Sequence, residues 1–434
     1  MENLLLTSEL ARTLYKSVVS LPIIDFHNHL PVNDIVGNRQ YRDLTELWVA
    51  ADPYKHRAMR ICGVPEQLIT GNATSKEKFL AWAQTVPKLL GNPLWHWSRL
   101  ELLRVFGIEE ELTPETAESI WRRTGEMLAT PQYRTQVILE RFNIEYAAPC
   151  CTLQDSLEPF TLNGASALAG KAMRLVPSLR GDNLLSPTPE LLAQLSSRLD
   201  AFHRAGCRIA DHALDAGFRY LPDTGEDRDV LANGIKDELA TTSAMLRLLG
   251  QEYARRGWIL QLHIGALRKT SDRLRREAGP AGGYAGIGHS CDIASISAFL
   301  NDLERLPFGL PRTILYTLNP VDHAALAVLA GSFPGDGVRG KVQLGPAWWL
   351  CDHIHGMKDC FEVSSAYGVL SVFNGMTTDS RSILSFVRHE YFRRAFCAWL
   401  ASKVDAGEMP DEYPRLEQLA RQICYENAKA VLQL

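Results

Sequence analysis

IIDFHNHL, at residues 23–30, is a short apolar run that ends in two histidines one residue apart. On a β-strand, side chains at positions i and i+2 point to the same face, so His27 and His29 are expected to project together from the end of a buried strand. Two imidazoles held in this way can bind one divalent metal ion. A lone His-x-His fits an ordinary strand–loop junction equally well, so the rest of the chain has to decide.

Short runs dense in apolar and β-branched residues recur along the chain, and a helical pattern follows each of them. After residues 22–30 they are IEYAAPC (144–150), MRLVPSL (173–179), CRIADHA (207–213), WILQLHI (258–264), TILYTLN (313–319), KVQLGPA (341–347) and VLSVFNGM (369–376). Such runs are typical of strands buried on both faces of a parallel sheet. Eight alternating strand–helix units predict an α/β fold, a (β/α)8 TIM-like barrel.

Residues 40–135, between the first two predicted strands, have helical periodicity and no convincing strand. One helix start is marked by Thr113, Pro114 and Glu115, which supply a capping threonine, a proline at the first helical position and an acidic first turn. We therefore expect three parts. They are residues 1–39 with an N-terminal amphipathic helix and the first strand, a helical insertion at 40–135, and residues 136–434 with the remainder of the barrel and C-terminal helices.

The composition is that of a globular enzyme, with 46% hydrophobic and 22% charged residues. A net charge of −4 offers no basic surface for nucleic acid, and no apolar run approaches the roughly 20 residues that a membrane-spanning helix needs. The N-terminus lacks the cationic start and cleavage site of a signal peptide. Nine scattered cysteines without a CxxC pair indicate buried thiols in a reducing compartment, so we expect a cytoplasmic protein.

Barrel enzymes carry their chemistry at the C-terminal ends of the strands. That row contains His27, His29, His212, His263, Asp379 and Arg381. The first and eighth strands are neighbours in a closed barrel, so His27, His29 and Asp379 can meet at one ion. This arrangement resembles the metal-dependent barrels of the amidohydrolase superfamily. The fourth strand has no lysine and the sixth no histidine, which favours a mononuclear site. His263 either ligates the ion or only lines the pocket.

Longer motifs narrow the resemblance. They are residues 54–97, LQLHIGALR (260–268), ILYTLNP (314–320), GPAWWLCDHIHGM (345–357) and GMTTDSRSILSFVRHEYFRR (375–394). Together they span the chain from the first strand to the C-terminal helices. On these motifs the chain resembles the uronate isomerases. The resemblance implies interconversion of D-glucuronate with D-fructuronate and of D-galacturonate with D-tagaturonate.

The resemblance also implies roles for individual residues. His27, His29 and Asp379 would hold one divalent metal ion, expected to be zinc. The residues implied in catalysis are Tyr54, Asp379 and Arg381, and those implied in substrate binding are Arg180, Arg381, Trp348, Trp349 and His263. Tyr54 would reach over the sugar from the insertion, and the tryptophan pair would follow the seventh strand.

The implied reaction makes chemical demands that these residues can meet. Isomerisation through an enediol needs a base that moves a proton between C2 and C1, and an electrophile for the developing oxyanion. Tyr54 or Asp379 can serve as the base, and the metal or Arg381 as the electrophile. The planar fork of an arginine matches the two oxygens of a substrate carboxylate, for which Arg180 and Arg381 are the candidates.

Four loop positions depart from the family pattern. Pro53 replaces a histidine, Gly181 replaces a proline, residues 151–155 lack a Thr-Asp-Asp-Pro segment, and His289 replaces an aspartate. All four lie near strand ends, whereas the metal triad is intact. We therefore expect a retained metal reaction with altered substrate contacts.

Several alternatives stay open at the level of sequence. The same scaffold could support a mononuclear hydrolase or decarboxylase acting on a related sugar acid, or a non-catalytic sugar-acid binding protein. Zinc, manganese, cobalt and iron suit the donor set about equally, and a homo-oligomer is possible. The second His-x-His, His353 and His355, is interpreted as surface.

Overall fold

The computed structural model describes residues 3–161, 173–232 and 237–434. Its parallel strands curl into the predicted TIM-like α/β barrel. The strands are β1 (Ile23–Asn28), β2 (Ile144–Cys151), β3 (Arg174–Leu175), β4 (Ser178–Arg180), β5 (Ile209–Leu214), β6 (Ile259–Ile264), β7 (Ala266–Leu267), β8 (Gly286–Ile287), β9 (Thr313–Thr317) and β10 (Val342–Leu344).

The main sheet has the order β1-β2-β4-β5-β6-β9-β10, with β3 paired to β2, and every pairing in it is parallel. All residues of β1, β6, β9 and β10 are buried, as expected of strands covered on both faces. The predicted third strand is divided into β3 and β4, which flank Pro177. Proline has no N–H to donate to the ladder, so it interrupts the strand. A small antiparallel pair, β7 and β8, lies outside this sheet.

The prediction of an eighth strand at residues 369–376 is wrong. A short 3-10 helix occupies Leu370–Val372, and irregular backbone follows it. Gly375 and Asp379 have φ angles of +79° and +48°, which an extended strand does not accommodate. The segment of residues 377–380 nevertheless lies beside β1, because Asp379 N–H donates to the His27 carbonyl at 3.1 Å and His29 N–H to the Ser380 carbonyl at 2.9 Å.

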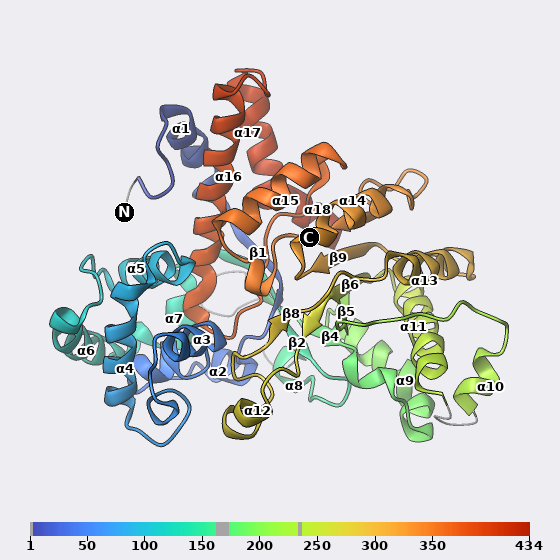
Figure 1. Ribbon diagram of the computed structural model, residues 1–434, viewed down its shortest axis with the longest axis horizontal. Helices are drawn as coiled ribbons and strands as arrows, with labels where there is room; N and C mark the ends of the chain where they lie inside the picture. The colour runs from blue at the N-terminus through green and yellow to red at the C-terminus, as the bar shows by residue number, and fades with distance from the viewer. Residues whose placement is uncertain (1–2, 162–172, 233–236) are drawn as a thin grey trace.

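Every element between β1 and β2 is helical. The helices are α2 (Val32–Val36), α3 (Pro53–Ile61), α4 (Ser75–Thr85), α5 (Pro93–Phe106), α6 (Pro114–Leu128) and α7 (Thr135–Glu140). The start of α6 is the predicted one, where Thr113 forms a capping box with Thr116. In Figure 1, α3 to α6 lie together on one side of the barrel. We propose residues 40–135 as an insertion on that basis.

The remaining α-helices precede β1 or follow β2 in the chain. They are α1 (Glu9–Val18), α8 (Glu158–Thr161), α9 (Pro189–Arg204), α10 (Asp227–Ala232), α11 (Glu238–Arg255), α12 (Asp272–Ala278), α13 (Ile293–Arg305), α14 (His323–Gly331), α15 (Ile354–Ala366), α16 (Val387–Asp405), α17 (Tyr413–Arg421) and α18 (Asn427–Leu432). Helix α1 packs against α16 and α17, so the N-terminal helix lies beside two helices from the C-terminal part of the chain (Figure 1). No helix within the described ranges is long and apolar enough to cross a membrane.

Candidate active site

His27, near the end of β1, and His29, one residue beyond it, converge on one carboxylate. His27 Nε2 lies 3.3 Å and His29 Nε2 3.1 Å from Asp379 Oδ1. Ligand atoms at about 2.0–2.1 Å from a tetrahedral zinc ion are about 3.3 Å apart, so these separations fit a shared divalent ion. The i, i+2 spacing on the strand therefore delivers both imidazoles to one side of the barrel end, as the sequence pattern predicts.

Asp379 is held in place by the neighbouring strand. The Asp25 carboxylate, fully buried in β1, accepts hydrogen bonds from Thr378 N–H at 2.8 Å and from the Thr378 hydroxyl at 2.7 Å. The left-handed conformation at Asp379 then turns its side chain toward the histidines. The side-chain hydrogen bonds of Asp25 thus add to the two backbone hydrogen bonds that join this segment to the first strand.

The charge state of this triad follows from burial and mutual contact. Burial raises the pKa of Asp379, but the hydrogen bonds with His27 and His29 outweigh it and hold that pKa well below its usual value. Burial lowers the pKa of His29. The same effect at His27 is outweighed by Asp379 and Asp211, so the pKa of His27 is raised. An ionised carboxylate between two imidazoles is the donor set that a divalent cation requires.

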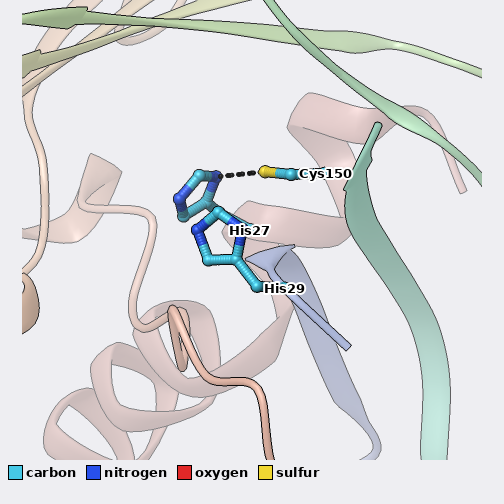
Figure 2. A group of neighbouring side chains, drawn as sticks. All are labelled: His27, His29 and Cys150. Carbon is cyan, nitrogen blue, oxygen red and sulfur yellow. Dashed lines mark hydrogen bonds between the residues drawn. The ribbon is translucent and has the colours of Figure 1, made fainter. Parts of the chain in front are cut away.

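Three further residues lie near His27: His263, which the sequence analysis names, and Cys150 and Asp211, which it does not. Cys150 Sγ lies 3.6 Å from His27 Nδ1 and 3.5 Å from Asp211 Oδ1. His263 Nδ1 lies 3.7 Å from Asp211 Oδ2, and its Nε2 is buried without a hydrogen-bond partner in the described part of the chain. Figure 2 shows Cys150 beside the histidine pair, and ligand atoms of His27, His29 and Cys150 lie within 4.8 Å of one another.

Tyr54 enters the site from the start of α3. Asp52 caps this helix by accepting from the N–H groups of Tyr54 and Lys55 at 2.9 and 3.2 Å, and Pro53 occupies the first turn. The Arg388 guanidinium lies 4.5 Å from the Tyr54 ring centre and 4.0 Å from that of Trp97. Burial raises the pKa of Tyr54 despite the opposing charge of Arg388, so the phenol is protonated at neutral pH.

These groups line one pocket of about 330 Å³, a size suited to a small organic molecule. All the sequence-predicted site residues lie on its wall, namely His27, His29, Tyr54, Arg180, His263, Trp348, Trp349, Asp379 and Arg381. Other residues of the wall include Asp211, Arg268 and four positions between Pro280 and Ala285. Arg57 of α3 donates to the Ala285 carbonyl at 3.0 Å, which joins the helical segment to that stretch.

The three pocket arginines differ in their engagement. Arg180 pairs with Asp182 at 2.8 Å. Arg268 pairs with Asp215 at 2.8 Å and lies over the Trp349 ring. Arg381, in contrast, is exposed and makes no ion pair or hydrogen bond with any residue that the structure describes. It therefore offers both edges of its guanidinium to a ligand.

Some residues in the predicted row of chemistry lie elsewhere. His212 points away from the pocket, and its Nε2 lies 3.0 Å from the Tyr253 hydroxyl. Because neighbouring residues of a strand face opposite ways, the preceding residue, Asp211, faces the pocket instead. His353 caps α15 by accepting from Gly356 N–H at 3.0 Å, and His355 is exposed.

Among the departures from the family pattern, the structure explains Gly181 and shows where Pro53 and His289 lie. Gly181 lies against the His212 ring, where a Cβ atom would come within 2.1 Å of Cε1, so this position excludes the proline. Pro53 lines the pocket. His289 is exposed and its ring nitrogen contacts the neighbouring Ser290 carbonyl, so it lies outside the pocket wall.

Comparisons with known proteins agree on one kind of relative. A model of the glucuronate isomerase family matches residues 1–188 and 184–432. A uronate isomerase of Salmonella paratyphi A is 40% identical over 99% of this chain and 97% of its own length. The crystal structure of a Thermotoga maritima uronate isomerase, 31% identical, superposes with a TM-score of 0.90 over 100% of this chain and 99% of that one. A glucuronate isomerase structure from Caulobacter crescentus, 25% identical, has a TM-score of 0.89 over 100% and 96% of the two chains.

Proposed function

This chain belongs to the glucuronate isomerase family, and from that premise we propose how its pocket performs the reaction. The protein is an enzyme, an aldose–ketose isomerase of hexuronates. The comparisons favour neither a hydrolase or decarboxylase nor a non-catalytic binding protein. One observation carries the residue assignments: two histidine Nε2 atoms face a single carboxylate oxygen in a pocket that also contains three arginines.

The site can hold one divalent metal ion, and we assign His27, His29 and Asp379 as its ligands and zinc as the ion. The separations of the ligand atoms and the mixed nitrogen–oxygen donor set support this assignment. When bound, the ion supplies a Lewis acid for the negative charge that develops on a sugar oxygen.

We assign the substrate carboxylate to Arg381, because it is the pocket arginine without a carboxylate partner in the described structure. Arg180 and Arg268 are each partly neutralised by an adjacent aspartate, which suits them to hydroxyl groups of the sugar. Trp348 and Trp349 supply flat apolar walls against which the C–H faces of the open-chain sugar can pack.

The proton transfers are divided between Asp379 and Tyr54. One proton moves from C2 to C1 and another from the O2 hydroxyl to O1. Asp379 Oδ1 faces the histidines, so we assign Oδ2 to the proton at carbon. Its low pKa makes it a weak base, and the C2 proton must therefore be acidified by charge stabilisation at the neighbouring oxygen. Tyr54 is protonated before the reaction and is assigned to give its proton to O1 and to take the proton of the O2 hydroxyl, which restores the phenol.

The direct test is proton NMR of the zinc-loaded protein with D-glucuronate and D-galacturonate in D2O. Ketose formation at an enzymatic rate, on the order of 1–1000 per second, is expected together with deuterium incorporation at C1. D-glucose, which lacks the carboxylate, should not react. No conversion by protein with demonstrated bound zinc contradicts the proposal.

Matched variants separate the assigned roles. Asp379→Asn and Tyr54→Phe should lower kcat. Arg381→Met should raise KM for the uronates, and Arg381→Lys should recover part of that loss because a point charge cannot bind both carboxylate oxygens. If Arg381→Met leaves KM unchanged, another arginine holds the carboxylate.

We also propose that the protein is cytoplasmic. A second proposal is that it forms a homo-oligomer. Nine free cysteines support a reducing compartment. Cell fractionation tests the location, and light scattering coupled to size-exclusion chromatography tests the oligomeric state.

A further inference from the structure

Cys150 lies behind one of the histidines that face the metal position. Strand β2 runs parallel to β1, with Pro149 opposite Asn28, and this register brings the Cys150 side chain to the His27 ring. Its Sγ atom approaches Nδ1, whereas Nε2 of the same ring faces Asp379. Figure 2 shows the dashed contact between Nδ1 and the thiol.

This geometry separates Cys150 from the ligand set, although its distance to the histidines falls within metal-binding range. The two nitrogens of an imidazole point to opposite sides of the ring. An ion shared by His27 Nε2, His29 Nε2 and Asp379 therefore lies on the side of the His27 ring remote from the thiol. Cys150 is placed to act on the ring, not on the ion.

The thiol connects two imidazoles through one carboxylate. Its S–H is directed at Asp211 Oδ1 at 3.5 Å, which leaves the sulfur lone pairs to accept from His27 Nδ1–H at 3.6 Å. The other oxygen of Asp211 lies 3.7 Å from His263 Nδ1. If both rings carry their proton on Nδ1, both Nε2 lone pairs are free, and that of His263 is the buried nitrogen without a described partner.

We propose that Cys150 is a positioning residue of the metal site, which fixes the tautomer and the ring angle of His27 by accepting from Nδ1–H and by relaying that hydrogen bond to Asp211. The proposal rests on the metal site assigned above. Metal-bound histidines commonly donate their second N–H to a carboxylate, a carbonyl or water. Here the carboxylate of Asp211 does not contact the His27 ring directly. The Cys150 thiol lies between them and hydrogen-bonds to both.

The test is the zinc affinity of the purified full-length protein, measured by competition with a chromophoric chelator. Cys150→Ala should weaken zinc binding about 10- to 100-fold, the loss usual for such supporting contacts. Cys150→Val fills the space of the thiol without a hydrogen bond and should show the same loss. Cys150→Ser keeps a donor and an acceptor and should recover most of the affinity.

Cys151 provides the matched control. It is buried on the same strand, and its Sγ contacts the Pro149 carbonyl instead of the site. Cys151→Ala should leave zinc affinity unchanged. Wild-type affinity in both Cys150→Ala and Cys150→Val overturns the proposal.

The cobalt-substituted protein distinguishes positioning from direct ligation. A positioning role predicts a wild-type spectrum without a thiolate-to-cobalt charge-transfer band, and a shift of the visible d–d bands in Cys150→Ala. A charge-transfer band that disappears in Cys150→Ser identifies Cys150 as a ligand and refutes the proposal. A wild-type protein that binds no zinc overturns the metal assignment itself, which separates that failure from a failure of the positioning role.

Discussion

Replacing Asp25 with alanine should destabilise the contact between β1 and residues 377–380, which lie where an eighth strand was predicted. Both carboxylate oxygens of Asp25 receive hydrogen bonds from Thr378, and Oδ2 also accepts from Asn28 Nδ2 at 3.2 Å. The His389 ring nitrogen lies 3.7 Å away. Alanine removes every acceptor at once and leaves the Thr378 N–H and hydroxyl in a dry interior.

The expected cost follows from those two stranded donors. Each buried donor without a partner costs about 1–3 kcal/mol, so Asp25→Ala should lower the free energy of unfolding by about 2–6 kcal/mol. Asp25→Asn keeps one acceptor oxygen for Thr378 N–H, and the Thr378 hydroxyl can turn to accept from the new amide. We therefore expect a loss of about 1–2 kcal/mol for the asparagine variant.

Guanidinium unfolding of the metal-free protein, followed by tryptophan fluorescence and circular dichroism, measures these losses. Zinc affinity should also fall in Asp25→Ala, because Thr378 immediately precedes Asp379. Leu303→Ala, in the buried face of α13, is a comparably destabilising control far from the site and should keep zinc affinity. A loss below 1 kcal/mol for Asp25→Ala, or equal losses for alanine and asparagine, would refute the reasoning.

Three further outcomes are expected. Gly181→Ala should lower the free energy of unfolding by about 1–3 kcal/mol, because the new Cβ atom would meet the His212 ring. In a double-mutant cycle, adding His212→Ala should recover part of that loss, and additive losses would contradict this contact. Burial raises the pKa of Asp352 to about 7, so the folded state favours the protonated carboxyl and the free energy of unfolding should fall as pH rises from about 4 to 7. Denaturation measured at several pH values should show this slope, and Asp352→Asn should flatten it. Arg268→Met should raise KM for the uronates about tenfold with a smaller change in kcat, and steady-state kinetics showing only a kcat loss would place Arg268 in the chemistry.

Periodicity predicted most of the barrel because buried parallel strands are written in the sequence as unbroken apolar runs. It failed at residues 369–376, where an apolar run is compatible with a strand but Gly375, and Asp379 just beyond the run, adopt positive φ angles. Nothing in the local sequence indicates the left-handed conformation of Asp379, since the preceding residue, Thr378, is held by hydrogen bonds to Asp25 of β1. The strand was a reasonable local prediction defeated by a tertiary contact.

The site shows the same division between local and tertiary information. The i, i+2 rule predicted that His27 and His29 project together, and both approach Asp379, because His29 directly follows the strand that holds His27. On β5 the sequence analysis selected His212, but the residue that faces the pocket is Asp211. Adjacent residues of a strand face opposite ways, so an error of one position selects the wrong side chain. Cys150 could not be found from spacing, because its partners come from other strands.

The seam between β1 and residues 377–380 also fixes when the site can form during synthesis. His29 emerges from the ribosome near the start of translation, and Asp379 follows about 350 residues later. At about 5–20 residues per second, the two histidines spend about 20–70 s without their carboxylate. The hydrogen bonds between Asp25 and Thr378 form equally late, since Thr378 belongs to the same C-terminal segment as Asp379. A nascent chain therefore carries two of the three assigned ligands through most of its synthesis, and we expect metal binding to be a late event that follows closure of the barrel.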